Sequence, residues 1–106
     1  MAKKYTPTIK KLQKAINDKF GEKLLINKTQ FYSKETDRVF EILIIKKAIY
    51  DDEMDKYRNV ELFSSPSDVQ IVLWLRDYWY ELNGWEVPTD NQKWLEAKKK
   101  YEEKHT

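Results

Sequence analysis

The chain has 106 residues, of which 41% are hydrophobic and 36% are charged, and its formal net charge is +2. This composition is typical of one folded domain, excludes a disordered chain, and gives no indication of nucleic-acid binding from net charge. Cysteine is absent, which excludes disulfides, thiolate metal sites and cysteine nucleophiles. With no apolar run of membrane-spanning length and no hydrophobic leader at the N-terminus, a cytoplasmic protein is expected. Heavy use of Lys, Ile, Asn and Tyr fits an AT-rich bacterial or phage genome.

The first predicted element is an amphipathic helix, preceded by a loose basic tail over residues 1–5. Thr6 and Pro7 are suited to the N-cap and the first helical position, and Gly21 is suited to the left-handed residue that ends a helix. The apolar side repeats at helical spacing through Ile9, Leu12, Ile16 and Phe20. The outer side is basic and carries Lys10, Lys11 and Lys14.

Three strands follow. The segments Leu24–Tyr32 and Arg38–Ala48 are rich in aliphatic, aromatic and β-branched residues, which predicts two strands. The polar link over residues 33–37 has hairpin length, so the two strands should be antiparallel neighbours. The second strand is continuously apolar and is expected at the centre of the sheet. An acidic turn over Ile49–Lys56 and a short third strand over Arg58–Phe63 complete the sheet.

The segment Ser65–Pro88 predicts one long helix with clear signals at both ends. Ser65 is the expected N-cap, and Pro66 suits the first helical position. At the other end, Asn83-Gly84 supplies a left-handed residue after the last turn. Trp85 should then fold back on Tyr80, the contact that accompanies a Schellman motif.

On a helical wheel this segment is apolar around most of its circumference. Its one narrow polar stripe contains Gln70, Asp77 and Glu81. The sheet is expected to cover the side that contains Ile71, Leu75, Tyr78 and Leu82. The first and last helices are expected to cover Val72 and Trp79, using Ile16, Phe20, Trp94 and Tyr101. Arg76 interrupts the apolar surface, and we expect it to pair with an acid because an unpaired guanidinium there is costly.

The last predicted element is a short helix with a T-x-x-Q capping box formed by Thr89 and Gln92. It should dock through Trp94 and Tyr101 and fray over residues 103–106. The predicted order is therefore helix, three antiparallel strands, long helix and short C-terminal helix. This order indicates a single small α+β domain over residues 1–106, with the helices packed on one sheet face.

The sequence offers little for catalysis or metal binding. His105, the single histidine, lies next to the C-terminal residue, and neither glycine belongs to a phosphate-binding loop. One acidic cluster contains Asp51, Asp52, Glu53 and Asp55. It lacks the spacing of a calcium loop, so a solvated turn is the favoured interpretation. We expect no catalytic residue, no metal, no cofactor and no small-molecule substrate, and hence no enzyme.

The α-β-β-β-α order over residues 8–82 resembles the topology of the double-stranded-RNA-binding domain. That family has a lysine-rich start to its second helix, whereas this chain has Ser67, Asp68 and Gln70 there. The resemblance therefore implies a fold and not a function. Weak, salt-sensitive nucleic-acid binding is the alternative hypothesis. Its candidate residues are Lys10, Lys11 and Lys14 on the first helix, and Lys46 and Lys47 on the central strand.

Protein binding is the favoured function, because large aromatic side chains gather between residues 74 and 94. Tryptophan and tyrosine are enriched in interface hot spots. The candidate partner-binding residues are Trp74, Arg76, Tyr80 and Trp85. An aromatic strip that includes Trp74, Tyr80 or Trp85 is expected to stay partly exposed and to contact a protein partner or a second copy. A small regulatory or accessory protein, from a phage or another mobile element, fits these features.

Overall fold

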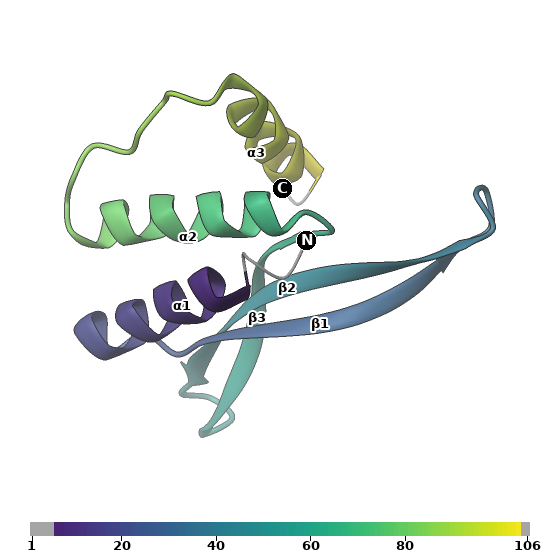
Figure 1. The fold of residues 1–106 in the computed structure, drawn as a ribbon. Coiled ribbons are helices and arrows are strands. Elements are labelled where there is room, and N and C mark those ends of the chain that lie inside the picture. Colours follow the sequence, from purple (N-terminus) through teal and green to yellow (C-terminus); the bar gives the residue numbers. More distant parts are fainter. Residues whose placement is uncertain (1–5, 105–106) are drawn as a thin grey trace.

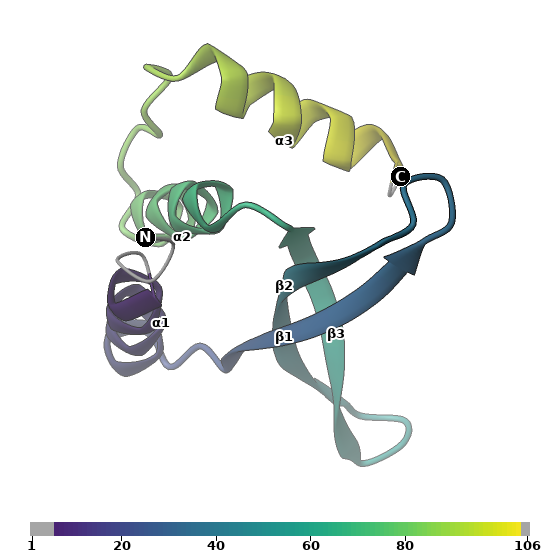
Figure 2. The same cartoon turned by 45° about the vertical axis from the view of Figure 1, so that its right-hand side comes forward.

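The computed structural model describes residues 6–104 and contains one antiparallel three-stranded sheet and three helices (Figure 1). In chain order the elements are α1 (Thr6–Phe20), β1 (Leu24–Ser33), β2 (Arg38–Asp51), β3 (Lys56–Ser65), α2 (Asp68–Leu82) and α3 (Gln92–Lys104). The helices lie on one side of the sheet, with α3 above α2 (Figures 1 and 2). This confirms the α+β prediction. The tails expected at 1–5 and 103–106 lie mostly outside the described residues, although 103–104 belong to α3.

The strand order is β1-β2-β3, so β2 is central, as its apolar sequence predicts. All three strands are longer than expected, because the backbone ladders continue to the edges of the turns. β2 runs three residues past Ala48, and its last pair with β3 is Asp51 with Lys56. Only residues 34–37 and 52–55 are left as turns. In β3, Leu62 is an extra residue that forms a bulge, since Lys46 pairs with Glu61 and Ile45 with Phe63.

The two turns share one construction. Each ends on an aspartate with a left-handed backbone, since φ is 51° at both Asp37 and Asp55. The hydroxyl of Tyr32 donates to Oδ1 of Asp37, and the hydroxyl of Tyr50 donates to Oδ1 of Asp55. The matching segments are YSKETDR and YDDEMDK, which begin at these two tyrosines. Aspartate tolerates the left-handed region and can bond locally, so this repeated pattern is suited to closing a hairpin.

The core lies between the sheet and the helices, and Ile45 of β2, Ile16 of α1 and Ile71 of α2 have no exposed surface. Burying such a side chain contributes about 1.5 to 3 kcal/mol. The buried hydrophobic residues of the described chain are Ile9, Ile16, Leu24, Ile45, Phe63, Ile71, Leu75 and Trp94. The predicted sheet-facing side of α2 is therefore confirmed through its two buried members, Ile71 and Leu75.

The two outer helices cover α2 differently from the expectation. α1 covers Trp79, whose ring meets Phe20 edge to face at 5.5 Å. α3 was expected to share this role, but its Trp94 and Tyr101 contact Phe63 of β3 instead, at 5.5 Å and 4.8 Å between ring centroids. The reason is that α3 docks over the end of β3 and over the polar stripe of α2. The helical wheel had left this stripe open to solvent.

The start of α2 differs from the prediction. The N-cap is Ser67, whose Oγ accepts a hydrogen bond of 3.4 Å from the backbone N–H of Gln70. Ser65 is instead the last residue of β3, because its backbone pairs with Leu43 of β2. Its buried hydroxyl accepts from the Ser67 N–H at 3.0 Å and donates to Oε1 of Gln70 at 2.8 Å. Ser65 therefore supports the helix start without capping it.

The predicted end of α2 is confirmed, although the helix stops at Leu82 and residues 83–88 lie outside it. Gly84 has a φ of 74°. The backbone N–H of Trp85 donates to the carbonyl of Tyr80 at 2.9 Å, and the Gly84 N–H donates to the carbonyl of Glu81 at 3.0 Å. These are the two hydrogen bonds of a Schellman motif. The Trp85 and Tyr80 rings meet edge to face at 5.5 Å.

The predicted capping box of α3 is wrong. The helix begins at Gln92, and Oδ1 of Asn91 accepts a hydrogen bond of 2.9 Å from the backbone N–H of Trp94. Thr89 lies in the irregular link before the helix. The helix therefore begins later than the sequence pattern predicts. In this link the Asp90 carboxylate lies 3.5 Å from Arg76 on α2.

Candidate interaction surfaces

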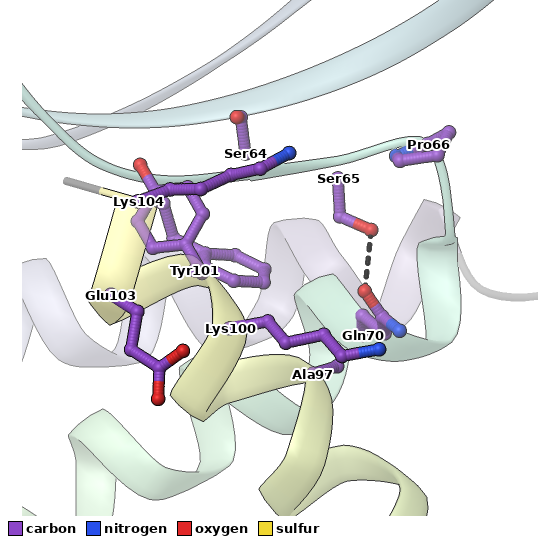
Figure 3. Close-up of a pocket in the computed structure, with 10 residues that line it drawn as sticks. Ser64, Ser65, Pro66, Gln70, Ala97, Lys100, Tyr101, Glu103 and Lys104 are labelled. Atoms are coloured by element: carbon purple, nitrogen blue, oxygen red, sulfur yellow. Dashed lines mark hydrogen bonds between the residues drawn. The ribbon is translucent and has the colours of Figure 1, made fainter.

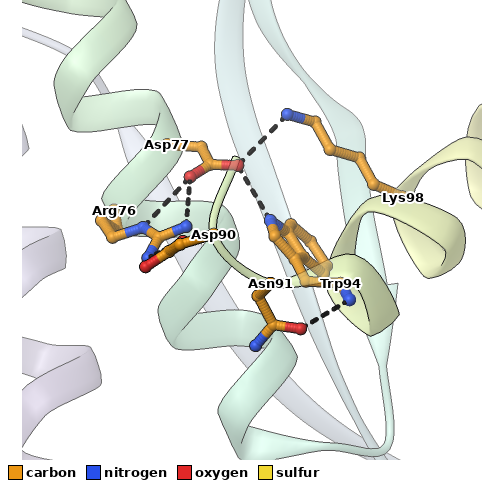
Figure 4. A network of polar contacts seen from close by, with 6 residues as sticks. All are labelled: Arg76, Asp77, Asp90, Asn91, Trp94 and Lys98. Carbon is orange, nitrogen blue, oxygen red and sulfur yellow. Dashed lines mark hydrogen bonds and ion pairs between the residues drawn. The ribbon is translucent and has the colours of Figure 1, made fainter. Parts of the chain in front are cut away.

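A buried carboxylate joins α3 to α2 (Figure 4). Asp77 was expected in a solvated stripe, but only 2% of it is exposed, because α3 covers it. Its Oδ1 accepts hydrogen bonds of 3.2 Å from Nε and Nη2 of Arg76. Its Oδ2 accepts from Nε1 of Trp94 at 2.8 Å and from Nζ of Lys98 at 3.2 Å. Four donors and two cations compensate the burial of this charge.

The prediction that Arg76 pairs with an acid is confirmed within the chain, through Asp77 and Asp90. The cluster has no spare polar group. Within residues 6–104, every buried side-chain nitrogen or oxygen has a hydrogen-bond partner. A fully paired cluster of this kind is suited to holding two helices together.

The structure brings together three of the four predicted partner-binding residues. Arg76 and Tyr80 are four positions apart on α2, so they share one side of the helix, and Trp85 lies against Tyr80. Trp74 lies on another side, where its ring stacks on Tyr78 at 4.8 Å and on Phe63 at 6.3 Å. The position of Asp77, covered by α3, falls between the two sides.

Trp85 is exposed and held in place, with 53% of its surface accessible. Its backbone is fixed by the Schellman motif and its ring by Tyr80. On the other side, Nζ of Lys19 lies 6.0 Å from the Trp85 ring and 5.0 Å from the Trp79 ring, and donates a 2.7 Å hydrogen bond to Oδ1 of Asn83. We call the group Arg76, Tyr80 and Trp85 the Trp85 surface. The predicted partial exposure of the aromatic strip is confirmed here.

The five candidate nucleic-acid-binding lysines do not form one surface. The three on α1 are exposed, and Lys14 pairs with Asp18 at 2.6 Å. Lys46 and Lys47 are neighbours in β2, so their side chains leave opposite faces of the sheet. Lys47 points towards α2, where its Nζ lies 2.7 Å from Oε1 of Glu22.

The Lys47–Glu22 pair also includes Tyr78 of α2, whose hydroxyl donates to the same Glu22 oxygen at 2.5 Å. Burial by itself raises the pKa of Glu22, but the hydrogen bonds from Lys47 and Tyr78 outweigh it and lower this pKa overall. The hydrogen bond to Glu22 raises the pKa of Lys47, and burial raises that of Tyr78. This group links β2, α2 and the segment before β1, and the Glu22 carboxylate compensates the positive charge of Lys47.

The sheet face opposite the helices is apolar along its centre. Ile45 points into the core, so alternation along β2 turns Phe40, Ile42 and Ile44 the other way. We call this the open sheet face; its apolar members are Leu25, Phe31, Phe40, Ile42, Ile44, Ala48, Tyr50 and Tyr57. Aromatic pairs lie at its two ends, Phe31 with Phe40 and Tyr50 with Tyr57. The sequence analysis left open whether this face is solvated or used and did not name its residues, although the run VFEILII, apolar at odd and even positions, was the signal for it.

No family, no curated protein and no solved structure matches the chain. Among residues 6–104, no helix is long and apolar enough to cross a membrane. In the same residues, no three His, Cys, Asp or Glu side chains are grouped to hold a metal ion.

A shallow cavity of about 510 Å³ lies between the end of β3 and the C-terminal half of α3 (Figure 3). Its wall includes Phe63, Ala97 and Tyr101, with Lys100 and Lys104 among its polar lining residues. The Tyr101 hydroxyl donates to Oε2 of Glu61 at 2.8 Å, and burial raises the pKa of this tyrosine strongly. Tyr101 thus stays neutral and ties α3 to β3.

Proposed function

We propose that this chain is a non-enzymatic protein-binding module of a regulatory or accessory kind, and that it binds its partner through the Trp85 surface. One observation carries the proposal: Trp85 is half exposed although its backbone and its ring are both held in place. A side chain that is already ordered loses little conformational entropy on binding, and tryptophan is the residue type most typical of interface hot spots.

The surroundings of Trp85 support the same interpretation. Arg76 is one-quarter exposed and lies close to Asp90, so a polar rim borders the aromatic pair of Trp85 and Tyr80. An aromatic centre with a polar rim is the usual anatomy of a protein interface. Trp74, the fourth predicted residue, contributes less to this proposal because its ring lies against Phe63 and Tyr78.

A binding role is also favoured over a catalytic one by the use of the charged clusters. Asp77 accepts from Arg76, Trp94 and Lys98, and Glu22 accepts from Lys47 and Tyr78. Both carboxylates are thus engaged in holding elements of the fold together. Nucleic-acid binding, the alternative, has support only from the three exposed lysines of α1, because Lys47 is paired with Glu22 and Lys46 lies on the sheet face away from α1.

The test is affinity capture from the native host cytoplasm after nuclease treatment, with the parent chain, Trp85→Ala and Met54→Ala. Met54 is the matched control, because it is 61% exposed but lies in the β2–β3 turn. Loss of a hot spot costs at least about 2 kcal/mol, so Trp85→Ala should weaken binding of the captured protein by about thirtyfold or more. The urea unfolding midpoint of each variant shows whether the fold is retained. Equal capture by Trp85→Ala and the parent would overturn the proposal.

A further inference from the structure

The open sheet face is unusual for a solvent-facing side of an antiparallel sheet. Such faces are normally polar, with apolar residues only on the core side. Here Phe40, Ile42 and Ile44 occupy consecutive outward positions of the central strand. Between the aromatic pairs at the two ends of this face, the charged residues are Lys46, Glu61 and Lys23, whose Nζ lies 5.2 Å from the Tyr57 ring, in a chain of which 36% is charged. Depletion of charge around an apolar centre is typical of interface cores.

The described helices leave this face uncovered. Within residues 6–104, α1, α2 and α3 all lie on the other side of the sheet (Figures 1 and 2). Several of its side chains are therefore strongly exposed, among them Leu25 at 43% and Tyr57 at 56%. Contiguous apolar patches of this kind on a single chain usually mark an interaction site.

We propose that the open sheet face packs against the same face of a second copy, which gives a two-fold symmetric dimer. The charges on the face support this occupant. Lys46 and Glu61 are register partners on neighbouring strands, so the face has charges of both signs at its centre. Glu61 also accepts from Tyr101 of α3, and Lys23 adds a second cation beside Tyr57. Such a face has opposite charges to offer its own two-fold image. Two-fold dimers with self-complementary interfaces are the commonest assemblies of identical chains.

The size of the face also fits a dimer. At about 3.3 Å per residue and 4.8 Å between strands, the part of β2 from Phe40 to Tyr50 with its two neighbours covers about 33 by 14 Å. Two such faces would bury about 1,000 Å² in total, which is the lower limit for a specific interface. We therefore expect a dimer that forms at micromolar concentrations and dissociates on dilution.

The surroundings of the face disfavour a polyanion as its occupant. The cations between the aromatic pairs are Lys23 and Lys46, and the adjoining turn at the Tyr50–Tyr57 end is acidic through Asp51, Asp52, Glu53 and Asp55. A nucleic acid stacked on the four aromatic rings would meet this turn. The proposed dimer also leaves the Trp85 surface free, because that surface belongs to α2 on the other side of the sheet. The dimer and the proposed function can therefore fail separately.

The first experiment is sedimentation equilibrium over a range of about 5 to 500 μM, where weak dimers of this size dissociate measurably. The average mass of the parent should rise from 12.9 kDa towards twice that value. Leu25→Glu places a charge on the open sheet face and should keep the mass at that of one chain. Val39→Glu is the control: Val39 is 61% exposed and lies on the opposite face of β2. Trp85→Ala should dimerise like the parent.

The second experiment needs no destabilising change. The chain has no cysteine, so single cysteines can be placed at Thr29 and Gln30, two exposed neighbours on opposite faces of β1. The maleimide labelling rate of Thr29→Cys, on the open sheet face, should fall at least fivefold from dilute to concentrated protein. The labelling rate of Gln30→Cys should be the same at the two concentrations. A mass of 12.9 kDa at every concentration, or a Thr29→Cys labelling rate that does not change with concentration, would overturn the proposal.

Discussion

The indole N–H of Trp94 on α3 donates a hydrogen bond of 2.8 Å to Oδ2 of Asp77 on α2. The same indole ring packs edge to face on Phe63 of β3 at 5.5 Å. One side chain therefore supplies both the apolar and the polar part of the contact that holds α3. A buried indole needs a hydrogen-bond acceptor, and a carboxylate at the centre of α2 meets this need.

The first prediction concerns this carboxylate. Asp77→Asn keeps the shape of the side chain but removes the charge that compensates Arg76 and Lys98. Breaking one partner of a buried ion cluster costs about 3 to 5 kcal/mol, so the free energy of unfolding in urea should fall by about that amount. Asp90→Asn is the control, because Asp90 is largely exposed and should change stability by less than about 0.5 kcal/mol. Similar unfolding midpoints for the two variants would contradict the structural role of Asp77.

The second prediction concerns the start of α2. Ser67→Ala removes the N-cap and should lower the free energy of unfolding by about 1 kcal/mol. Ser67→Asn should restore most of this loss, because asparagine is an equally good cap. At the buried Ser65, by contrast, Ser65→Asn should destabilise, since it removes a hydroxyl that bonds both the Ser67 N–H and Oε1 of Gln70. If asparagine were tolerated at 65 and harmful at 67, the cap would be at Ser65 after all.

The third prediction concerns pH. The pKa of Glu22 is below its ordinary 4.5 in the folded chain, so the folded state gains stability from this carboxylate above pH 4.5. This contribution is lost as the pH falls below 4.5 and through the folded-state pKa. Glu22→Gln should therefore be less stable than the parent by about 1 to 2 kcal/mol at pH 7, from the lost hydrogen bonds to a charged group.

Urea unfolding of both proteins across the pH range tests this. The stability gap between the parent and Glu22→Gln should narrow steadily below pH 4.5. Asp18→Asn serves as the comparison, because Asp18 makes only an exposed pair with Lys14 and its loss should have little effect at any pH. A gap that stays constant down to low pH would show that Glu22 is not stabilised as a carboxylate.

The fourth prediction concerns the basic side of α1. Three lysines on one exposed helix face are too few for tight phosphate binding, so we expect no measurable DNA or RNA binding at physiological salt. Any binding at low salt should have a log–log salt slope of about −2.7, and it should disappear when Lys10, Lys11 and Lys14 are changed to Gln. Binding that survives this triple change would place the nucleic-acid site elsewhere on the chain.

The ends of α2 show why some boundaries were predictable and others were not. Its C-terminus depends on Gly84, which takes the left-handed backbone that most residues avoid, and this signal is local. Its N-terminus offers two serines of similar capping ability, Ser65 and Ser67. The choice between them is made by the pairing of Ser65 with Leu43, which is a contact distant in sequence.

The sequence analysis placed Asp77 in a solvent-exposed polar stripe for a related reason. The helical wheel correctly separates polar from apolar positions, but it carries no information about which element will cover a polar one. Asp77 is covered by Trp94 and Lys98, which come from α3. The exposed Trp85 and its contact with Tyr80 follow from the local Schellman motif, and this part of the candidate site was therefore predictable.

The repeated turn has a further consequence for β2. Because this strand is apolar on both faces, a slip of one residue would exchange one apolar face for another at little hydrophobic cost, and the hydrophobic pattern alone cannot define the pairing. The turns can define it. Tyr32 with Asp37 and Tyr50 with Asp55 close the two ends of β2 in the same local conformation, and each closure sets which residues face one another across the neighbouring ladder. Strand register in this sheet is thus specified from its two ends rather than from its core.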